Sequence, residues 1–215
     1  IHCPMHVIPL MKASKLKTVA TVHDLANFKF PQFYTNSKQK YLTTLTKLSA
    51  KRADHLIAVS QNTKQDLIEL LGIEESKISV VHNGLNLDSP PLNEDEFQKF
   101  KQKHALPNKY LLFVGTLDPR KNIEGLLDAL IHLAQQKSKT YPLVIAGPKG
   151  WLYENIEKKI KKYQEISRVI ITGYLQDPEL VSLYQNAHLF IYPSFYEGFG
   201  FPVLEAMANS APVIC

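Results

Sequence analysis

The stretch Tyr192-Pro-Ser-Phe-Tyr-Glu-Gly-Phe-Gly-Phe-Pro-Val-Leu-Glu-Ala-Met-Ala208 decides how the rest of the chain is interpreted. Residues 189–192 are apolar and predict a buried strand, and residues 202–208 predict a helix. Between them, Gly198 and Gly200 give a loop in which the backbone can approach a ligand without a Cβ in the way. The unpaired N–H groups at the start of such a helix favour an anion, so this unit predicts a phosphate site.

Two carboxylates frame the glycine loop. Glu197 precedes the first glycine, and Glu205 follows within the predicted helix. A carboxylate repels phosphate, so these acids predict contacts with neutral groups beside the anion. Sugar hydroxyls meet this requirement, because a carboxylate accepts charge-assisted hydrogen bonds from them. A phosphate flanked by two hydroxylated rings is a sugar nucleotide, which the pattern therefore indicates as the ligand.

The same stretch resembles the Glu-x7-Glu signature of retaining glycosyltransferases of family 4, which have the GT-B fold, and the resemblance continues through most of the chain. It implies that Glu197 binds hydroxyls of the donor sugar and that Glu205 binds the ribose hydroxyls. It also implies further donor contacts from Gly198, Phe199, Gly200 and Leu204. For the two glycines alone, an ordinary turn between a strand and a helix is the alternative interpretation.

A second candidate region is the segment Gly115-Thr-Leu-Asp-Pro-Arg-Lys121, between a predicted strand and a predicted helix. Arg120 and Lys121 stand at the helix N-terminus, where the dipole disfavours cations unless an anion lies between. A solvated basic pair is the alternative. The segment resembles the family's diphosphate-binding loop, which implies that Lys121 contacts the diphosphate with support from Arg120, and that Gly115 contacts the donor. Thr116 stands where many relatives carry arginine, so one cation fewer is expected.

Two shorter motifs match the same family. His23 lies at the carboxyl end of a predicted strand and resembles a family histidine that reaches the donor sugar; a hydrogen-bonded core histidine is the alternative. Gly173, Tyr174 and Leu175 resemble the loop whose backbone contacts the nucleotide base, with an ordinary turn as the alternative. The catalytic set that the resemblance implies is His23, Arg120, Lys121 and Glu197.

Strand and helix patterns alternate along the chain, which predicts parallel, doubly wound sheets. In the first part we expect strands at 19–23, 56–59 and 78–82, and helices at 38–53 and 61–71. Ser60 is the expected N-cap of the second helix, Gly72 its end, and Asn83-Gly84 a turn. In the second part we expect strands at 110–114, 143–146, 169–171 and 189–192. One intervening helix is expected to start with Asp177 as N-cap and Pro178 in first position.

The predicted fold class is α/β, with two Rossmann-like domains of the GT-B type. Residues 1–91 are the expected acceptor-side domain, 92–108 a linker, and 109–215 the nucleotide-sugar-binding domain. Pro90-Pro91 and the charged segment after it interrupt the pattern and motivate this boundary. The chain starts without methionine and stops within an apolar run, so we expect both domains to be truncated.

Composition restricts the class of protein. Apolar and charged fractions of 45% and 21% over 215 residues are those of a globular protein. The sequence contains no apolar run of transmembrane length and no recognisable signal peptide. Residues 1–91 carry eleven Lys/Arg against seven Asp/Glu, which is compatible with a peripheral membrane contact or with solvated lysines. No basic patch interleaved with aromatics indicates nucleic acid. The two cysteines fit a reducing compartment, so we expect a cytoplasmic protein. The basic first part is compatible with a place at the inner face of the membrane.

The sequence holds no Asp-x-Asp pair and no histidine or cysteine spacing typical of a metal site. We therefore expect no cofactor and a metal-independent mechanism. The family resemblance implies transfer of a hexose. Because His23-Asp24 and the segment 115–122 look similar to bacterial mannosyltransferases that build surface polysaccharide, it favours mannose from GDP-mannose. The expected acceptor is a glycan or a lipid-linked sugar in cell-surface polysaccharide synthesis. A non-catalytic nucleotide-sugar or glycan binding module is one alternative. A dinucleotide-dependent oxidoreductase is disfavoured, because Gly147-x-x-Gly150 is the nearest approach to a G-x-G-x-x-G motif.

Overall fold

A computed structural model describes residues 1–5, 7–8, 16–86 and 88–215. The described chain forms two compact units. The first consists of Ile1–Gly84 together with the short segment Tyr196–Phe199, and the second of Leu85–Phe195 and Gly200–Cys215. Each unit has its own apolar core, as expected for two separate Rossmann-like domains.

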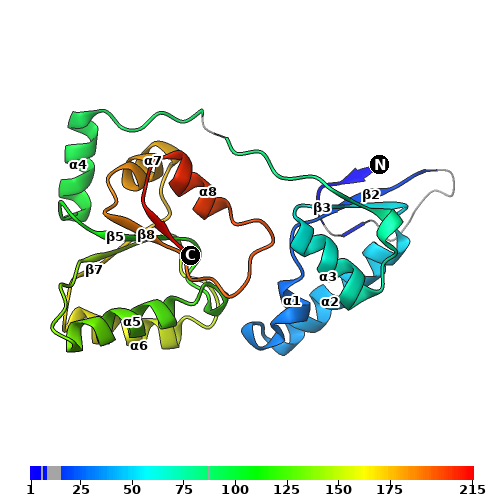
Figure 1. The fold of residues 1–215 in the computed structure, drawn as a ribbon, viewed down its shortest axis with the longest axis horizontal. Helices are drawn as coiled ribbons and strands as arrows, with labels where there is room; N and C mark the ends of the chain where they lie inside the picture. Colours follow the sequence, from blue (N-terminus) through cyan, green and yellow to red (C-terminus); the bar gives the residue numbers. More distant parts are fainter. Residues whose placement is uncertain (6, 9–15, 87) are drawn as a thin grey trace. The chain divides into compact units, whose positions relative to one another are not determined.

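The first unit is built on a parallel sheet with strand order β1-β2-β3-β4. Its strands are β1 (His2–Cys3), β2 (Val19–Val22), β3 (His55–Ala58) and β4 (Ile78–Val80). The helices α1 (Ala26–Lys29), α2 (Asn36–Arg52) and α3 (Gln61–Leu71) lie on one side of this sheet (Figure 1). Helices on a common face follow from right-handed crossovers between successive, neighbouring strands.

The start and end of α3 agree with the sequence prediction. Ser60 Oγ accepts a hydrogen bond from the N–H of Thr63 at 3.1 Å, and Gly72 ends the helix. Leu67 and Leu71 are buried in the core of the first unit. This helix is therefore determined locally, by its capping residues and its apolar face.

The second unit holds a parallel sheet with strand order β7-β6-β5-β8-β9. Its strands are β5 (Leu111–Val114), β6 (Leu143–Ala146), β7 (Val169–Gly173), β8 (Leu189–Ile191) and β9 (Val213–Ile214). The chain moves outward from β5 to β7, then returns to place β8 on the other side of β5. The position between β5 and β8 is the topological switch point, where open α/β sheets bind ligands beyond the carboxyl ends of their strands.

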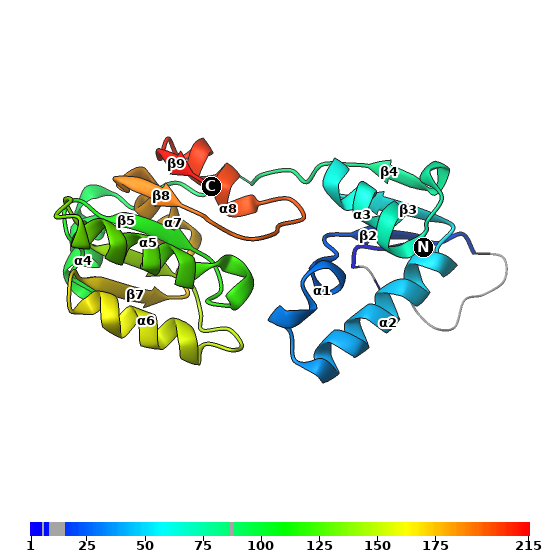
Figure 2. The same cartoon turned by 60° about the horizontal axis from the view of Figure 1, so that its bottom comes forward.

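Five helices accompany this sheet within the described part of the second unit. They are α4 (Glu94–His104), α5 (Ile123–Gln135), α6 (Glu154–Gln164), α7 (Asp177–Gln185) and α8 (Phe201–Ala208). Figures 1 and 2 show α5 and α6 on one face of the sheet, and α7 and α8 lie on the other face in Figure 1. Ile123, Leu126, Leu127, Leu130 and Ile131 of α5 are buried and form one apolar stripe along this helix.

The segment expected as a linker, 92–108, is instead part of the second unit. It carries α4, and Phe97 and Phe100 of this helix are buried in the second core. Asn93 caps the helix by accepting from the N–H of Glu96 at 3.0 Å. The charged character of this segment belongs to its solvent-facing side, whereas the two phenylalanines bind it to the sheet domain. The division between units lies at Gly84–Leu85.

Three local expectations also need correction. Helix α7 has Gln176 as N-cap, so Asp177 and Pro178 each lie one position further inside than predicted. Glu179 Oε2 accepts from the N–H of Gln176 at 2.9 Å, which accounts for the earlier start. Strand β4 ends at Val80, and no turn forms at Asn83-Gly84. There the chain runs on irregularly into the second unit.

Candidate functional site

Two loops leave the carboxyl ends of β5 and β8 at the switch point of the second sheet. One contains residues 115–121, with a short 3-10 turn at Pro119–Lys121, and the other starts at residue 192. The N–H of Phe195 and the hydroxyl of Ser194 both donate to the carbonyl of Arg120, at 3.0 and 3.2 Å. The basic loop and the first part of the Glu-x7-Glu stretch are therefore joined by hydrogen bonds, although they are far apart in the sequence.

Lys121 is buried at this point, with 8% of its surface exposed. Its ammonium donates to the hydroxyl of Tyr192 at 2.6 Å and lies 5.1 Å from the centre of that ring. The preceding Asp118 is also buried and accepts from the N–H of Arg120 at 3.0 Å, which fixes the 3-10 turn. The Lys121 ammonium therefore lies at the switch point, beside the strand end that leads into the Glu-x7-Glu stretch.

The carboxyl ends of β5, β6 and β7 lie side by side at the same edge of the second sheet as these two loops. The N–H of Gly147 donates to the carbonyl of Gly173 at 2.9 Å, and the N–H of Gly115 donates to Ala146. Tyr174 is exposed, whereas Leu175 is buried in the second core. Because the Leu175 side chain belongs to the core, only its backbone is left for the predicted contact with a nucleotide base.

Glu205 lies on α8 and is half-buried. Its Oε2 accepts from the hydroxyl of Tyr184 on α7 at 2.9 Å. Burial and the neighbouring Glu205 charge raise the pKa of Tyr184 far above its usual value, so the phenol stays protonated and donates. Helix α8 begins after Gly200, whose φ of 91° is a left-handed conformation that glycine adopts easily. Leu204, on the same helix, is exposed.

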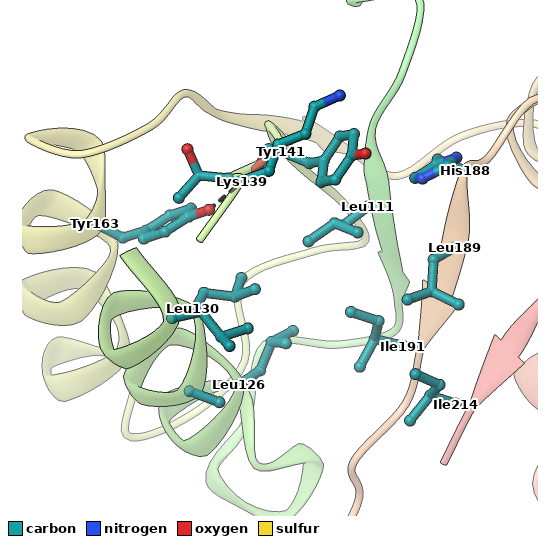
Figure 3. Close-up of a pocket in the computed structure, with 13 residues that line it drawn as sticks. Leu111, Leu126, Leu130, Lys139, Tyr141, Tyr163, His188, Leu189, Ile191 and Ile214 are labelled. Carbon is teal, nitrogen blue, oxygen red and sulfur yellow. Dashed lines mark hydrogen bonds between the residues drawn. The ribbon is translucent and has the colours of Figure 1, made fainter. Parts of the chain in front are cut away.

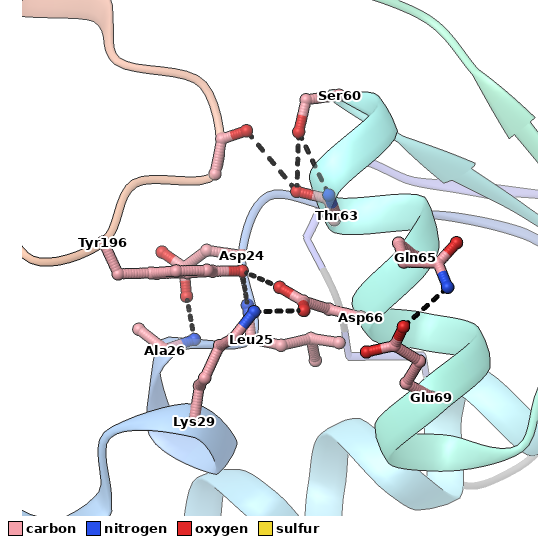
Figure 4. Close-up of polar contacts among 11 residues, drawn as sticks. Asp24, Leu25, Ala26, Lys29, Ser60, Thr63, Gln65, Asp66, Glu69 and Tyr196 are labelled. Atoms are coloured by element: carbon pink, nitrogen blue, oxygen red, sulfur yellow. Dashed lines mark hydrogen bonds and ion pairs between the residues drawn. The ribbon is translucent and has the colours of Figure 1, made fainter.

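The other predicted site residues belong to the first unit. His23 follows β2, and its Nε2 donates to the carbonyl of Pro4 at 2.8 Å. Gly198 packs so closely on the His23 backbone that a Cβ there would lie 1.7 Å from the His23 carbonyl oxygen. Thr63 donates its hydroxyl to the Gly198 carbonyl at 3.4 Å (Figure 4). Phe199 lies beside the ring of His82, with 6.0 Å between ring centres.

The predicted residues thus fall into two groups. His23, Glu197, Gly198 and Phe199 lie in the first unit. Gly115, Arg120, Lys121, Gly173, Tyr174, Leu175, Gly200, Leu204 and Glu205 lie in the second. In the second group, the loop containing Arg120 and Lys121 is hydrogen-bonded to the strand-end segment that leads into the motif, and in the first group Gly198 contacts His23.

The sequence analysis missed four residues that contact or adjoin the predicted site residues, namely Asp66, Tyr184, Tyr192 and Tyr196. Asp66 carried a detectable signal, because it shares the buried face of α3 with Thr63 and Leu67. An acid on an apolar helix face is unusual and indicates a specific partner. The three tyrosines carried no such signal, since a tyrosine in an apolar pattern is ordinary core.

A separate apolar pocket of about 470 Å³ lies between α5 and the strands β8 and β9 (Figure 3). Its walls include Leu126, Leu130, Leu189, Ile191 and Ile214. The Tyr163 hydroxyl donates to the carbonyl of Tyr141 at 3.0 Å, within the second unit. None of the predicted site residues lines this pocket.

Within residues 1–5, 7–8, 16–86 and 88–215, no group of three or more His, Cys, Asp or Glu side chains is arranged to hold a metal ion. Over the same residues, no helix combines the length and apolar character needed to cross a membrane. Cys3 is buried and Cys215 exposed, and neither forms a disulfide.

Two family models together match nearly all of the chain. The model for glycosyl transferases group 1 matches residues 94–215, which include the basic loop and the complete Glu-x7-Glu stretch. The model for glycosyltransferase family 4 matches residues 1–89. The chain belongs to the group 1 glycosyl transferases. The structural boundary at Gly84–Leu85 lies near the point where one match ends and the other begins.

Two similar curated proteins are named mannosyltransferases of the O-antigen chain. O-antigen chain mannosyltransferase B of Escherichia coli is 32% identical over 200 residues, covering 93% of this chain and 52% of the relative. O-antigen chain mannosyltransferase RfbU of Salmonella typhimurium is 30% identical over 209 residues, covering 97% of this chain and 53% of the relative. The chain spans about half the length of the curated relatives it matches.

Solved structures agree on the GT-B fold. HepE from Anabaena, in complex with UDP and glucose, superimposes with a TM-score of 0.70 at 20% identity, covering 92% of this chain and 52% of that one. Sucrose-phosphate synthase from Thermosynechococcus elongatus gives 0.67 at 25% identity, covering 92% and 49%. The α/β architecture expected from the sequence is therefore confirmed for this group 1 glycosyl transferase.

Proposed function

We propose that the protein transfers a hexose from a nucleotide-diphosphate sugar to an acceptor hydroxyl with retention at the anomeric carbon. The observation that carries the proposal is the meeting of the basic loop and the Glu-x7-Glu stretch at the switch point between β5 and β8. The favoured donor is GDP-mannose, since the similar family members are named mannosyltransferases of the O-antigen chain. The acceptor class is a glycan or a lipid-linked sugar in cell-surface polysaccharide synthesis.

In this proposal, the second unit binds the nucleotide and the diphosphate. Lys121, with Arg120 beside it, stabilises the negative charge that develops on the leaving diphosphate. The backbone around Gly200 and the start of α8 offer N–H groups to the same anion. Glu205 binds the ribose hydroxyls, and the segment starting at Gly173 faces the base. A nucleoside diphosphate leaves as an anion, so the transfer needs charge stabilisation more than it needs a protonating acid.

The first unit supplies the groups for the sugar. Glu197 accepts hydrogen bonds from the donor-sugar hydroxyls, and His23 contacts the same ring. The His23 Nε2 hydrogen is engaged with the Pro4 carbonyl, which leaves Nδ1 as the ring atom for an additional partner. Gly198 and Phe199 follow Glu197 directly and provide backbone N–H groups beside it.

The proposed mechanism uses no metal ion for the diphosphate. Lys121, Arg120 and the N-terminus of α8 together supply positive charge where metal-dependent glycosyltransferases use a cation held by an Asp-x-Asp pair. We expect nucleotide affinity and sugar transfer to persist in EDTA. Loss of both in EDTA, with recovery in Mg²⁺ or Mn²⁺, would contradict this part of the proposal.

Isothermal titration calorimetry with GDP, UDP and ADP, in EDTA and at fixed salt, tests the donor site. We expect saturable binding of GDP, and Glu205→Ala is expected to weaken it about tenfold or more, because a charge-assisted hydrogen bond contributes about 1.5–3 kcal/mol. Glu69→Ala, in the first unit, is the matched control for removing one acid. Absence of binding by a chain that circular dichroism shows to be folded would contradict the proposal.

A transfer assay with GDP-mannose separates catalysis from binding alone. Binding of GDP-mannose without transfer to any mannose-terminated acceptor would favour the non-catalytic binding module for this chain. Transfer of radiolabelled mannose, with nuclear magnetic resonance showing the anomeric configuration of the product, would favour the retaining transferase.

We also propose a peripheral contact with the cytoplasmic face of a membrane through α2. This helix carries five cations and no acid over its 17 residues. Tyr41 and Leu48 are exposed by 65% and 46%, and they line a shallow apolar pocket together with Val7, Ile8 and Leu45. An apolar strip edged by cations suits the interface of an anionic bilayer, where each cation contributes about 1 kcal/mol.

Vesicle sedimentation tests the α2 contact. The chain is expected to bind vesicles of phosphatidylcholine with phosphatidylglycerol, and to bind phosphatidylcholine vesicles weakly. Lys40→Glu with Lys47→Glu should abolish the difference, because both lysines lie on the exposed side of α2. The matched control is Lys158→Glu with Lys162→Glu on α6, which changes net charge equally. Equal losses from both pairs would indicate nonspecific attraction and contradict a contact through α2.

A further inference from the structure

A buried carboxylate lies beside the Glu197 loop. Asp66 on α3 is 1% exposed, and both of its oxygens have partners. Oδ1 accepts from the ammonium of Lys29 at 2.7 Å, and Oδ2 accepts from the hydroxyl of Tyr196 at 2.5 Å (Figure 4). Burial of a charge is unfavourable unless each lone pair is satisfied, and a buried ion pair often stabilises a fold less than an apolar replacement. The Asp66 cluster therefore indicates a role other than stability.

Tyr196 fits this acceptor closely. It is 7% exposed, and its hydroxyl accepts from the N–H of Leu25 at 3.4 Å while donating to Asp66. Its ring packs against Phe30, with 5.8 Å between ring centres, and Lys29 Nζ lies 5.5 Å from the ring centre. Burial and the hydrogen bond to Asp66 raise the pKa of Tyr196 far above its usual value, so the phenol remains a donor.

The residue after Glu197 is fixed as well. Gly198 lies against the His23 carbonyl with no space for a Cβ, and its own carbonyl accepts from Thr63. The residues on both sides of Glu197 are therefore held by the first unit, one through its side chain and the other through its backbone. Two fixed neighbours fix the Glu197 backbone, and with it the position and direction from which the side chain extends.

We propose that Asp66 and Tyr196 are positioning residues that hold the Glu197 backbone, and thereby its carboxylate, in the orientation that binds the donor sugar. The proposal rests on the proposed function, in which Glu197 contacts sugar hydroxyls. Lys29 completes the arrangement by pairing with the second Asp66 oxygen, so that both oxygens of the buried carboxylate have a partner. Neither Asp66 nor Tyr196 needs to touch the donor.

The discriminating measurement is the difference between the affinities for GDP-mannose and for GDP, which isolates the contribution of the sugar. Tyr196→Phe removes one hydroxyl and is expected to reduce the GDP-mannose affinity about tenfold, while the GDP affinity stays within twofold of wild type. Tyr184→Phe is the matched control. It removes the hydroxyl that contacts Glu205, so it should weaken GDP and GDP-mannose equally.

A double-mutant cycle separates positioning from general damage. If Tyr196 acts through Glu197, Tyr196→Phe should add no further loss of sugar affinity in a Glu197→Ala background. Asp66→Asn keeps an oxygen acceptor for Tyr196 and should retain more sugar affinity than Asp66→Leu. Additive losses in the Glu197→Ala background, or unchanged sugar affinity in Tyr196→Phe, would overturn the proposal.

Amide hydrogen exchange gives a readout that needs no ligand. Exchange of the peptide containing residues 195–200 is expected to be at least tenfold faster in Tyr196→Phe and in Asp66→Leu than in wild type, with α7 and α8 unchanged. Unchanged exchange in both variants would overturn the positioning role. If wild type binds neither GDP nor GDP-mannose while this exchange result holds, the proposed function fails and the anchoring of the loop stands.

Discussion

Glu197 and Glu205 end the same motif, yet they are held in different ways. Glu205 projects from the regular helix α8 and accepts from Tyr184 on the neighbouring α7. Glu197 lies in an irregular segment, and its neighbours Tyr196 and Gly198 contact α3 and the end of β2. One acid is therefore oriented by secondary structure in the second unit, and the other by tertiary contacts in the first.

The difference suggests a division of labour between the two acids. A nucleotide presents the same ribose whichever sugar it carries, so a helix-borne acid with one phenol partner suffices for it. The sugar ring requires an orientation that suits one pattern of hydroxyls, and several contacts fix the backbone around Glu197. Variants at the two anchors should therefore separate nucleotide affinity from sugar affinity.

The largest effect is expected on the nucleotide side, from Lys121→Ala. Loss of the buried ammonium should weaken GDP and GDP-mannose alike, by about 2–5 kcal/mol, because the diphosphate loses its charged partner. Titration calorimetry at fixed salt measures both affinities, with Lys109→Ala, which removes an exposed lysine of the same unit, as control. Loss of GDP-mannose affinity without loss of GDP affinity would indicate that Lys121 contacts the sugar. It would contradict the assignment of nucleotide contacts to the second unit.

Alanine at the two glycines of the loop should act in different ways. Gly198→Ala places a methyl group against the His23 carbonyl, so the segment must move, at about 3 kcal/mol of stability. Gly200→Ala meets no atom within 4 Å and should lose only about 1–2 kcal/mol, from its φ of 91°. Thermal unfolding compares the two, and sugar affinity should fall mainly in Gly198→Ala. A larger loss in Gly200→Ala would contradict the close approach to His23.

Tyr184→Phe should have a smaller effect. Glu205 keeps its place on α8 but loses one hydrogen bond, so GDP affinity is expected to fall by about 1 kcal/mol. The difference between GDP and GDP-mannose should stay unchanged. Calorimetry of the pair Tyr184→Phe and Tyr196→Phe measures this directly. If both variants changed the GDP affinity and the GDP-mannose affinity in the same way, Glu197 and Glu205 would not be held independently.

The smallest effect at neutral pH concerns the ionisation of the same two tyrosines. Tyr184 and Tyr196 have raised pKa values in the folded chain, against an ordinary value of 10.0. Above that value the unfolded chain releases these protons and the folded chain keeps them, so their contribution to stability is complete below pH 10 and falls as the pH rises further. Urea unfolding between pH 8 and 11 should show a shallower decline in each phenylalanine variant than in wild type. Tyr41→Phe, at an exposed position, is the control for the loss of one phenol.

Much of the local structure could be predicted from the sequence. The apolar stripe of α5 and the cap at Ser60 each depend on residues within a few positions of one another. The prediction of a linker at 92–108 was wrong because it depended on long-range packing. Phe97 and Phe100 alone gave no indication of which core would bury them, and only packing against the second sheet decides that.

The candidate site shows the same division. Glu197, Glu205 and Lys121 were identifiable because the spacing of acids, glycines and cations near predicted strand ends carries chemical meaning. The pairing of Asp66 with Tyr196 could not be predicted from the sequence. The sequence indicated only that Asp66, an acid on the buried face of α3, needs a polar partner. Their partnership depends on residues 130 positions apart, which no local periodicity encodes.

The sequence by itself determined the order of strands and helices, the family, and the chemical types of the groups that could bind a nucleotide sugar. The order of elements follows from hydrophobic periodicity and capping residues, which are short-range signals. The family follows from the resemblance of the Glu-x7-Glu stretch and the basic loop to known motifs. Only the tertiary structure decided that Gly198 must be glycine because of the His23 carbonyl, and that Tyr196 is paired with Asp66. The physical reason is that close packing and the pairing of buried polar groups depend on which surfaces meet in space.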